Sequence, residues 1–346
     1  MLLFHNDYNE ICHPQVLEKM LSVKQEQMPG YSEDPCCASA AEKICRLCNN
    51  NNLDVHFLVG GTQTNLTVIA ASLRPHQGVI GADTAHINVH ETGAIEATGH
   101  KVIALEHVDG KITAAQVDAI VKEHYASGDA VHMVQPKMVY ISNPTELGTI
   151  YYKNELEALS AVCKENGLYL FVDGARLGYG LAASDNDVTL EDLARLCDVF
   201  YIGGTKVGAM FGEAVVISNP QISEGFRYLI KQRGAMLAKG WLLGVQFDAL
   251  MDNDLYFNIS KEANCLADKI RATLKELGYP LQVETTTNQI FPILSDDLLD
   301  KLGSNFTFAE MGRVDDKHRT VRFCTSWATK TESVQALCDR LKELSL

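Results

Sequence analysis

Short, continuously apolar runs separated by helix-like stretches are the feature that most constrains the fold of this chain. Between the runs, apolar residues recur at helical spacing, as in the stretch 66–73, which stops before Pro75. Runs without polar alternation predict strands of a mostly parallel sheet that helices cover on both faces. The runs are VHFLV (55–59), VIGA (79–82), KVIAL (101–105), MVYIS (138–142), LYLFV (168–172), DVFYI (198–202) and AVVIS (214–218). We therefore expect an α/β protein with a mostly parallel seven-stranded sheet.

The pattern changes toward the C-terminal end. A long helical stretch, SKEANCLADKIRATLKELG, precedes strand-like pieces and a final helical stretch, ESVQALCDRLKEL. This order predicts a smaller α+β domain beside the sheet. We expect an N-terminal segment at 1–25, a large domain at 26–247 and a small C-terminal domain at 248–346.

Composition and charge exclude several classes of partner. The 346 residues carry a formal net charge of −14, whereas nucleic-acid binding needs a basic surface. No stretch is long and apolar enough for a membrane helix, and the first residues turn polar too early for a signal peptide. We expect no nucleic-acid or membrane partner, and a cytoplasmic location.

Ten cysteines occur in the chain, four of them between residues 36 and 48. Cys45 and Cys48 have the spacing of a zinc ligand pair, but no second pair follows at a suitable distance. Both also lie on one face of a predicted helix, together with Ala41 and Ile44. We therefore expect these cysteines to pack in the core, and we expect no metal site.

Residues at the carboxyl ends of the strands are the main candidates for a binding site, because ligands bind beyond these ends in open α/β sheets. Gly60-Gly61-Thr62 follows the first run and begins a helical stretch, whose first N–H groups suit an anion such as phosphate. An ordinary strand-to-helix turn is the alternative. The segment matches neither common nucleotide-binding loop, which disfavours a nucleotide-linked oxidoreductase.

Three further strand ends carry chemically active side chains. His86 follows the second run, Asp173 and Arg176 follow the fifth, and Lys206 follows the sixth in the segment GGTKVGAM. Each has an ordinary alternative: a metal pair of His86 with His90, a polar turn at Asp173, or an isolated lysine. In this order, however, the residues fit pyridoxal phosphate, a flat aldehyde that bears a phosphate. Lys206 would form a Schiff base, and a buried carboxylate would keep the pyridine nitrogen protonated.

The sequence also resembles the threonine aldolase/β-eliminating lyase family of pyridoxal-phosphate enzymes of fold type I, over almost its whole length. The matching segments are NDYN, GYSEDP, FLVGGTQTN, ADTAHINVHETGA, FVDGARLGYG, GGTKVGA and VRFCTSWAT. The resemblance implies a large domain with a mostly parallel sheet and a smaller C-terminal domain, as the pattern of runs predicts.

The resemblance assigns cofactor-binding roles to particular residues. It implies that Lys206 carries the cofactor, that Asp173 faces the pyridine nitrogen and that His86 stacks on the ring. It places Arg176 near the cofactor or the substrate carboxylate. Gly61, Thr62 and Thr205 complete the expected cofactor site.

Other residues are expected on the substrate side. The resemblance implies that Arg322 clamps the α-carboxylate of the substrate, together with Asn6 and Arg176, because an arginine fork matches a carboxylate in two bonds. His132 resembles a second family histidine near the substrate hydroxyl, and an exposed histidine is the alternative. His86, His132 or a water that they position is the expected base.

Departures from the family pattern leave the substrate open. Asn6-Asp7-Tyr8 stands where aldolases usually have Ser-Asp-Thr, and the segment 142–146 reads SNPTE instead of Glu-Asn-Thr-His-Asn. Thr205 stands where the family usually has serine. Tyr8 either supplies a phenol near the substrate or packs.

The function expected from these residues is retro-aldol cleavage of L-threonine or L-allo-threonine to glycine and an aldehyde. β-Elimination and transamination on another amino acid are the alternatives. The resemblance also implies a homodimer or homotetramer with the active site at the subunit interface. Lys231 or Arg233 is a candidate for a phosphate contact across that interface.

Overall fold

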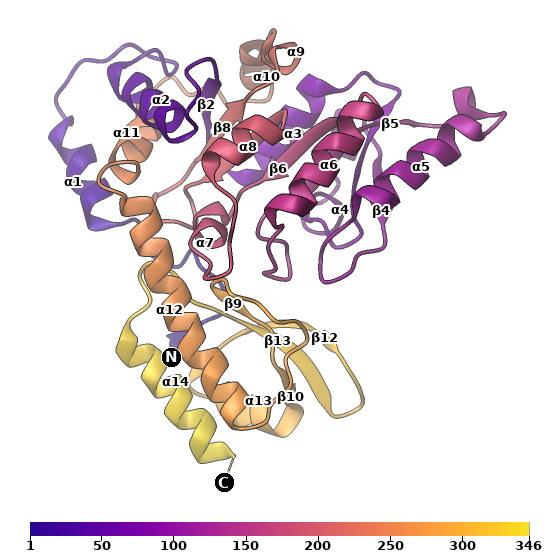
Figure 1. Ribbon diagram of the computed structural model, residues 1–346. Coiled ribbons are helices and arrows are strands. Elements are labelled where there is room, and N and C mark those ends of the chain that lie inside the picture. The colour runs from indigo at the N-terminus through magenta and orange to yellow at the C-terminus, as the bar shows by residue number, and fades with distance from the viewer. Residues whose placement is uncertain (346) are drawn as a thin grey trace.

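A computed structural model describes residues 1–345 and shows a large domain around one twisted sheet, with a smaller domain below it (Figure 1). The sheet has seven strands in the order β2-β8-β7-β6-β5-β3-β4, and only β8 runs antiparallel to its neighbours. The strands are β2 (Asp54–Leu58), β3 (Gln77–Ala82), β4 (Val102–Leu105), β5 (Gln135–Ser142), β6 (Tyr169–Asp173), β7 (Val199–Gly203) and β8 (Glu213–Ile217). Each overlaps one of the seven apolar runs to within one residue at the ends or extends beyond it, so the predicted mostly parallel sheet is confirmed.

Helices cover both faces of the sheet. The chain moves from β2 to β3 in one direction and from β4 through β5 and β6 to β7 in the other. Because such crossovers are right-handed, α3 lies on the face opposite α5, α6 and α8 (Figure 1). The helices of the large domain are α1 (Pro14–Ser22), α2 (Pro35–Leu47), α3 (Gly61–Ser72), α4 (His86–Val89), α5 (Ala114–Ala126), α6 (Lys153–Glu165), α7 (Leu177–Leu181), α8 (Leu190–Leu196), α9 (Pro220–Ser223), α10 (Phe226–Gln232) and α11 (Trp241–Leu250).

The small domain contains a second sheet with helices on one side. The long helix α12 (Leu255–Glu276) runs from the large domain into the small one (Figure 1). The other elements are β9 (Gln289–Ile290), β10 (Ile293–Ser295), α13 (Asp296–Leu302), β11 (Phe306–Thr307), β12 (Ala309–Arg313), β13 (His318–Cys324) and α14 (Thr331–Leu344). β13 pairs antiparallel with β9, β10 and β12, which makes this region α+β as expected.

The N-terminal residues belong structurally to the small domain. β1 (Leu2–Leu3) pairs in parallel with β11, and Phe4 is buried in the hydrophobic core of the small domain. That core takes its residues of α12 from Ala267 onward, whereas Ala263 and earlier residues pack in the core of the large domain. The chain therefore crosses between the domains twice, and the domain limits given above stay predictions.

The cysteines of α2 contribute to packing. Cys37 and Cys48 lie in the main hydrophobic core with Ile44, and Cys36 packs in a smaller cluster with Val245. Cys45 is partly buried, so the buried face of the helix is slightly rotated from the predicted one. No group of three or more potential metal ligands occurs among residues 1–345.

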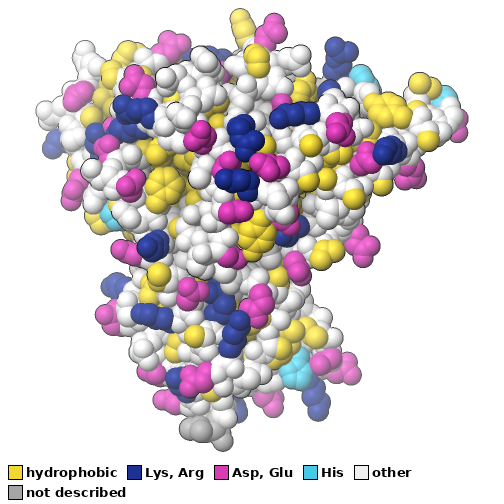
Figure 2. Space-filling view, viewed as in Figure 1, with side chains coloured by type: hydrophobic (Ala, Val, Ile, Leu, Met, Phe, Trp, Pro, Cys, Tyr) yellow, Lys and Arg dark blue, Asp and Glu magenta, His cyan; other side chains and the backbone are white. Residues whose placement is uncertain are grey.

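The visible surface mixes acidic and basic side chains without a large area of one sign (Figure 2). Among the described residues, no helix is both long enough and apolar enough to span a membrane.

Candidate active site

A cavity of about 340 Å³ opens at the carboxyl ends of the parallel strands. Six of the residues predicted from the sequence line it: Gly61, Thr62, His86, Asp173, Thr205 and Lys206. The same cavity is also lined by Tyr8, Val59, Gly60, Glu146, Ala175, Tyr201, Phe211 and Glu213. Residues that are far apart in the sequence thus meet where the sheet topology predicts a ligand site.

Glycines allow the Asp173 and Lys206 loops to approach each other. A Cβ on Gly203 would lie 2.3 Å from the carbonyl oxygen of Ala175, and a Cβ on Gly174 would lie 1.8 Å from that of Tyr201. Neither distance is possible for a real side chain. Gly174 and Gly203 are therefore required for the close packing of the two strand ends.

Asp173 is held as a buried carboxylate at the end of β6. Oδ1 accepts a hydrogen bond from the Ala175 N–H at 2.9 Å, and Oδ2 accepts from Asn65 Nδ2 at 3.0 Å and from the Tyr140 hydroxyl. Burial opposes ionisation, but the charge of His86 and the hydrogen bonds from Tyr140 and the Ala175 N–H lower the pKa of Asp173 below its ordinary value. The carboxylate is therefore ionised and suited to a protonated ring nitrogen.

His86 is oriented by a buried glutamate. Its Nδ1 lies 2.7 Å from Oε1 of Glu91, which also accepts from Asn65 Nδ2 at 2.7 Å. Asn65 thus connects the His86–Glu91 pair to Asp173. Burial disfavours the charged imidazole, but the bond to Glu91 and the charges of Glu146 and Asp173 raise the pKa of His86. A carboxylate beside Nδ1 favours the neutral tautomer that carries its proton on Nδ1. In that tautomer, Nε2 has the free electron pair.

Lys206 is an amine without a protein partner in the described chain. Its Nζ makes no ion pair and no hydrogen bond within residues 1–345, although its backbone carbonyl accepts from the Tyr179 hydroxyl at 2.6 Å. Burial lowers the pKa of Lys206, and the positive charge of Arg176 lowers it further. A lysine whose neutral form is favoured is a competent nucleophile toward an aldehyde.

The first turn of α3 forms an anion-binding cradle beside Lys206. Gly60 precedes the helix without a side-chain cap, so the first N–H groups of the helix are free. The hydroxyl of Tyr201 is buried without a hydrogen-bond partner in the described structure, and it also lines the cavity. Gly61 leaves space there, because a Cβ would lie 3.2 Å from this hydroxyl.

Arg176 is already engaged by a carboxylate. Its Nε and Nη2 donate to Asp7 at 2.7 and 3.0 Å, and Asn288 Nδ2 donates to Asp7 Oδ2 at 2.9 Å. Both members of the pair are buried. Arg176 does not line the cavity itself, so its predicted contact with cofactor or substrate stays a prediction.

Arg322 lies in β13 of the small domain and does not line the cavity, so its predicted contact with the substrate carboxylate stays a prediction. Its Nη1 donates to Gln289 at 3.2 Å and its Nη2 to the His5 carbonyl at 3.0 Å, while its Nε is buried without a partner among the described residues. Asn6 accepts from the Tyr8 N–H at 3.1 Å and does not line the cavity. Tyr8 lines the cavity and is 53% exposed, which favours the phenol interpretation over packing.

His132 is not brought to the site. It lies in an exposed 3₁₀ turn (Ala130–His132) before β5, whereas the cavity is at the opposite, carboxyl end of that strand. The structure therefore gives no support to a catalytic role for His132 in its own subunit. A role of His132 near the substrate hydroxyl stays a prediction.

Lys231 and Arg233 also lie outside the cavity. The Lys231 ammonium is 4.8 Å from the ring centroid of Tyr31, and the Arg233 carbonyl accepts from Gln63 at 3.3 Å. A contact to a neighbouring subunit stays a prediction.

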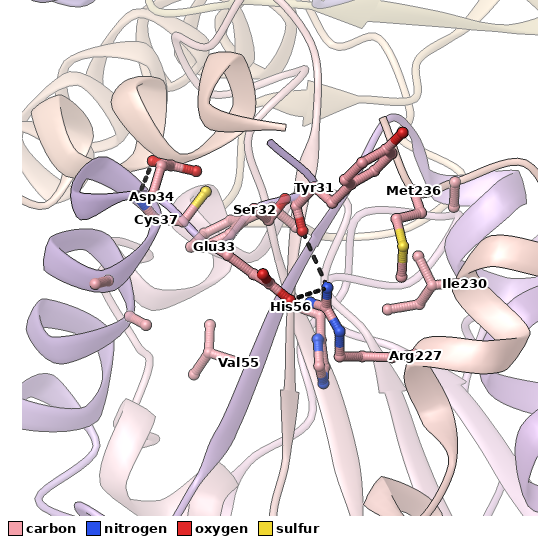
Figure 3. A pocket seen from close by; sticks show the side chains of 14 residues that line it. Tyr31, Ser32, Glu33, Asp34, Cys37, Val55, His56, Arg227, Ile230 and Met236 are labelled. Carbon is pink, nitrogen blue, oxygen red and sulfur yellow. Dashed lines mark hydrogen bonds and ion pairs between the residues drawn. The ribbon is translucent and has the colours of Figure 1, made fainter. Parts of the chain in front are cut away.

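A second cavity, of about 290 Å³, lies between α2, β2 and α10 (Figure 3). Its arginine, Arg227, is already paired with the Tyr31 carbonyl and with Glu33, at 3.2 and 3.1 Å. Asp34 caps α2 through the Cys37 N–H at 2.9 Å. None of the residues predicted for the site lines this cavity.

The first cavity fits pyridoxal phosphate. It combines an amine with a lowered pKa, an ionised buried carboxylate, a histidine ring, and free N–H and O–H donors beside a helix N-terminus. Lys206 would hold the aldehyde carbon, Asp173 the ring nitrogen, and Gly61 and Thr62 the phosphate.

Several residues of the site were not found from the sequence. Glu91 follows His86 within the family-like segment 82–94, but only the fold shows that the two pair. Asn65, Tyr140 and Tyr201 lie inside apparent core elements, and Asp7 gave no signal of its ion pair. Glu213 lies at the start of a predicted strand, where a charged residue before an apolar run is usually exposed.

Comparisons with known proteins agree with this geometry. Residues 12–297 match the family described as beta-eliminating lyase, so the chain belongs to that family. A low specificity L-threonine aldolase of Pseudomonas aeruginosa is 29% identical over 96% of this chain and 94% of its own length. The predicted family, fold type and pyridoxal-phosphate cofactor are confirmed by this membership together with the structural neighbours.

Solved structures give the same fold. A Leishmania major threonine aldolase is 46% identical and superimposes with a TM-score of 0.97 over the whole of both chains. An aspartate aminotransferase of Thermus thermophilus is only 15% identical but has a TM-score of 0.72 over all of this chain and 92% of its own. The likeness to the aminotransferase concerns the fold alone.

Proposed function

We propose that this chain is a pyridoxal-phosphate-dependent lyase that cleaves L-threonine or L-allo-threonine to glycine and acetaldehyde. The observation that carries the proposal is the meeting of an unpaired Lys206 with an ionised Asp173 in one cavity. The similarity to the Leishmania and Pseudomonas threonine aldolases supports the choice of substrate.

Different residues of the chain are proposed to bind the cofactor and the substrate during carbon–carbon cleavage. When bound, pyridoxal phosphate supplies an electron sink for the negative charge that develops at the substrate Cα. Asp173 stabilises a protonated ring nitrogen and so strengthens that sink. Arg322, held by His5 and Gln289, is the proposed clamp for the substrate carboxylate, because its buried Nε is still free to donate.

His86 is the proposed acceptor of the β-hydroxyl proton. Glu91 fixes its Nδ1–H, which leaves Nε2 free to take the proton. Glu146 lines the same cavity and raises the pKa of His86, which increases the basicity of the imidazole.

Product analysis tests the proposal. The purified holoenzyme is incubated with L-threonine, L-allo-threonine, L-serine and L-tyrosine, and glycine, acetaldehyde, pyruvate and ammonia are quantified. We expect equal amounts of glycine and acetaldehyde from at least one threonine isomer. Keto acid and ammonia without glycine would instead identify a β-eliminating lyase, the reaction that gives the matched family its description.

We also propose that the chain forms a homodimer or homotetramer and that it is located in the cytosol. The ten cysteines are all free in the structure, as is usual in reducing compartments. Light scattering on the eluted holoenzyme measures the mass of the assembly, and a mass of one chain would contradict the oligomer.

A further inference from the structure

Glu213 is a buried carboxyl group in the active-site cavity to which the proposed reaction gives no role. It begins β8 and is only 3% exposed. In the sheet it pairs with Leu58 of β2 and Gly203 of β7. Because these two residues directly precede the α3 cradle and the Lys206 loop, Glu213 lies between the two loops.

The hydrogen bonds of Glu213 leave one oxygen free. Oε2 accepts from the Gly204 N–H at 3.0 Å. Oε1 makes no hydrogen bond, and the carboxyl group no ion pair, within the described part of the chain. The Thr205 Oγ accepts a hydrogen bond from the Gly212 N–H at 3.0 Å, and its own O–H lies near Glu213, where it opposes part of the rise in the pKa of Glu213. In the acid form, Oε2 is then the carbonyl oxygen and Oε1–H is a free donor.

The surroundings of Glu213 favour the acid form. Burial raises the pKa of Glu213 to about 8, although the charge of Lys206 opposes this rise. Asp173 adds to the rise, and the hydroxyls of Tyr201 and Tyr256 lie within its electrostatic range. Helices α3 and α9, which pack on β8, contain no charged residue, and the charged residues of β2 lie further along that strand.

We propose that Glu213 is a proton-donating ligand of the cofactor phosphate, with Oε1–H directed at the anion that the first turn of α3 holds. The inference rests on the proposed function and adds a residue to its site. Two independent features support it: the free helix N–H groups of α3 and the carboxyl group of Glu213 line one cavity. A carboxylate there would repel a phosphate dianion, whereas a carboxylic acid attracts it.

A pH-dependent affinity for phosphate-bearing ligands follows from this role. Glu213 is neutral below its pKa of about 8 and charged above it. Raising the pH from about 7 to about 9 therefore converts most of the group to the repulsive form, and the affinity should fall about tenfold. A ligand without the phosphate should not respond to the ionisation of Glu213.

Binding of two matched ligands to the full-length chain, freed of its cofactor, tests the proposal without turnover. The probes are 4-deoxypyridoxine 5′-phosphate and 4-deoxypyridoxine, neither of which has an aldehyde to react with Lys206. Calorimetric titrations compare the wild type with Glu213→Gln, an isosteric variant whose amide still donates but does not titrate. Because both proteins keep Lys206 and bind the same two probes, a pH-dependent difference that only the phosphorylated probe shows is assigned to Glu213.

We expect the Glu213→Gln and wild-type affinities for the phosphorylated probe to agree within about threefold near pH 7 and to differ about tenfold near pH 9. Glu213→Met, which removes the donor, should weaken the binding of only the phosphorylated probe, by about tenfold near pH 7, where Glu213 of the wild type is neutral. An unchanged ratio between wild type and Glu213→Gln across this range would overturn the role of Glu213 alone. Failure of the wild type to bind the phosphorylated probe at all would overturn the cofactor assignment as well.

Discussion

The imidazole of His86 depends on a carboxylate that lies only five residues further along the chain. Glu91 is buried, and its Oε1 is shared between His86 and Asn65. This shared, buried acceptor holds the histidine ring in one orientation. The hydrogen bond to Glu91 therefore both positions the catalytic nitrogen and raises its basicity.

Replacing Glu91 by glutamine should lower the pKa of His86, because the negative partner of the imidazolium is lost while the shape of the side chain is kept. We therefore expect a measurable fall in the pKa of His86. Titration of ¹³C-labelled histidine by NMR measures it, with the resonance assigned from a His86→Asn variant. Glu96→Gln, an exposed glutamate nearby, is the control, and an equal shift in both variants would contradict the assignment.

Close contact between two loops is the feature that positions Lys206 at the scale of secondary-structure elements. The ends of β6 and β7 approach so closely that Gly174 has no room for a side chain. The Asp173 and Lys206 loops are therefore fixed relative to each other by backbone packing.

Gly174→Ala should destabilise the protein by about 3 kcal/mol or more and should strongly reduce cofactor retention, because one of the two loops must move. Gly128→Ala is a matched control, since a Cβ there meets nothing within 4 Å. Urea unfolding midpoints and bound-cofactor absorbance are compared for the two variants. Wild-type stability of Gly174→Ala would show that the loops tolerate separation.

The extent to which sequence predicts these elements differs between strands and side chains. Buried parallel strands such as β6 are apolar on both faces, so their runs are visible without knowledge of the fold. Strand order then places Asp173 and Lys206 at one edge of the sheet. Pairings such as His86 with Glu91 depend on side-chain directions in the loops, which no periodicity encodes. His132 lies before β5, at the opposite end of that strand from the cavity, which the local likeness to a motif did not indicate.

At the scale of the whole molecule, the N-terminal segment contacts both domains beside the active site. β1 is part of the small domain, and a few residues later Asp7 pairs with Arg176 of the large domain. Asn288, which precedes β9 of the small domain, donates to the same carboxylate. The Asp7 carboxylate thus links the two domains directly beside the active site.

Asp7→Asn should destabilise the protein by about 3 kcal/mol at neutral pH, because Arg176 keeps a buried charge without its partner. Against the effect of burial, Arg176 lowers the pKa of Asp7 below its ordinary value of 3.8. The stabilisation is therefore complete above that value and disappears only as the pH falls through the lower, folded-state pKa. Unfolding midpoints of the wild type and Asp7→Asn across this pH range measure the stabilisation, and the exposed Asp316→Asn is the control. If the two proteins still differed in stability at the lowest pH, the ion pair would not be the source of the difference.

Chemical mapping of the cofactor on the holoenzyme tests the central claim most directly. The protein with bound pyridoxal phosphate should absorb at about 420 nm. After reduction with borohydride and proteolysis, mass spectrometry should find the reduced cofactor on the peptide that contains Lys206. Lys206→Ala should lack both signals, and Lys122→Ala, which replaces an exposed lysine of α5, should keep them. A label on any other lysine, or an absorbance band that survives in Lys206→Ala, would contradict the account.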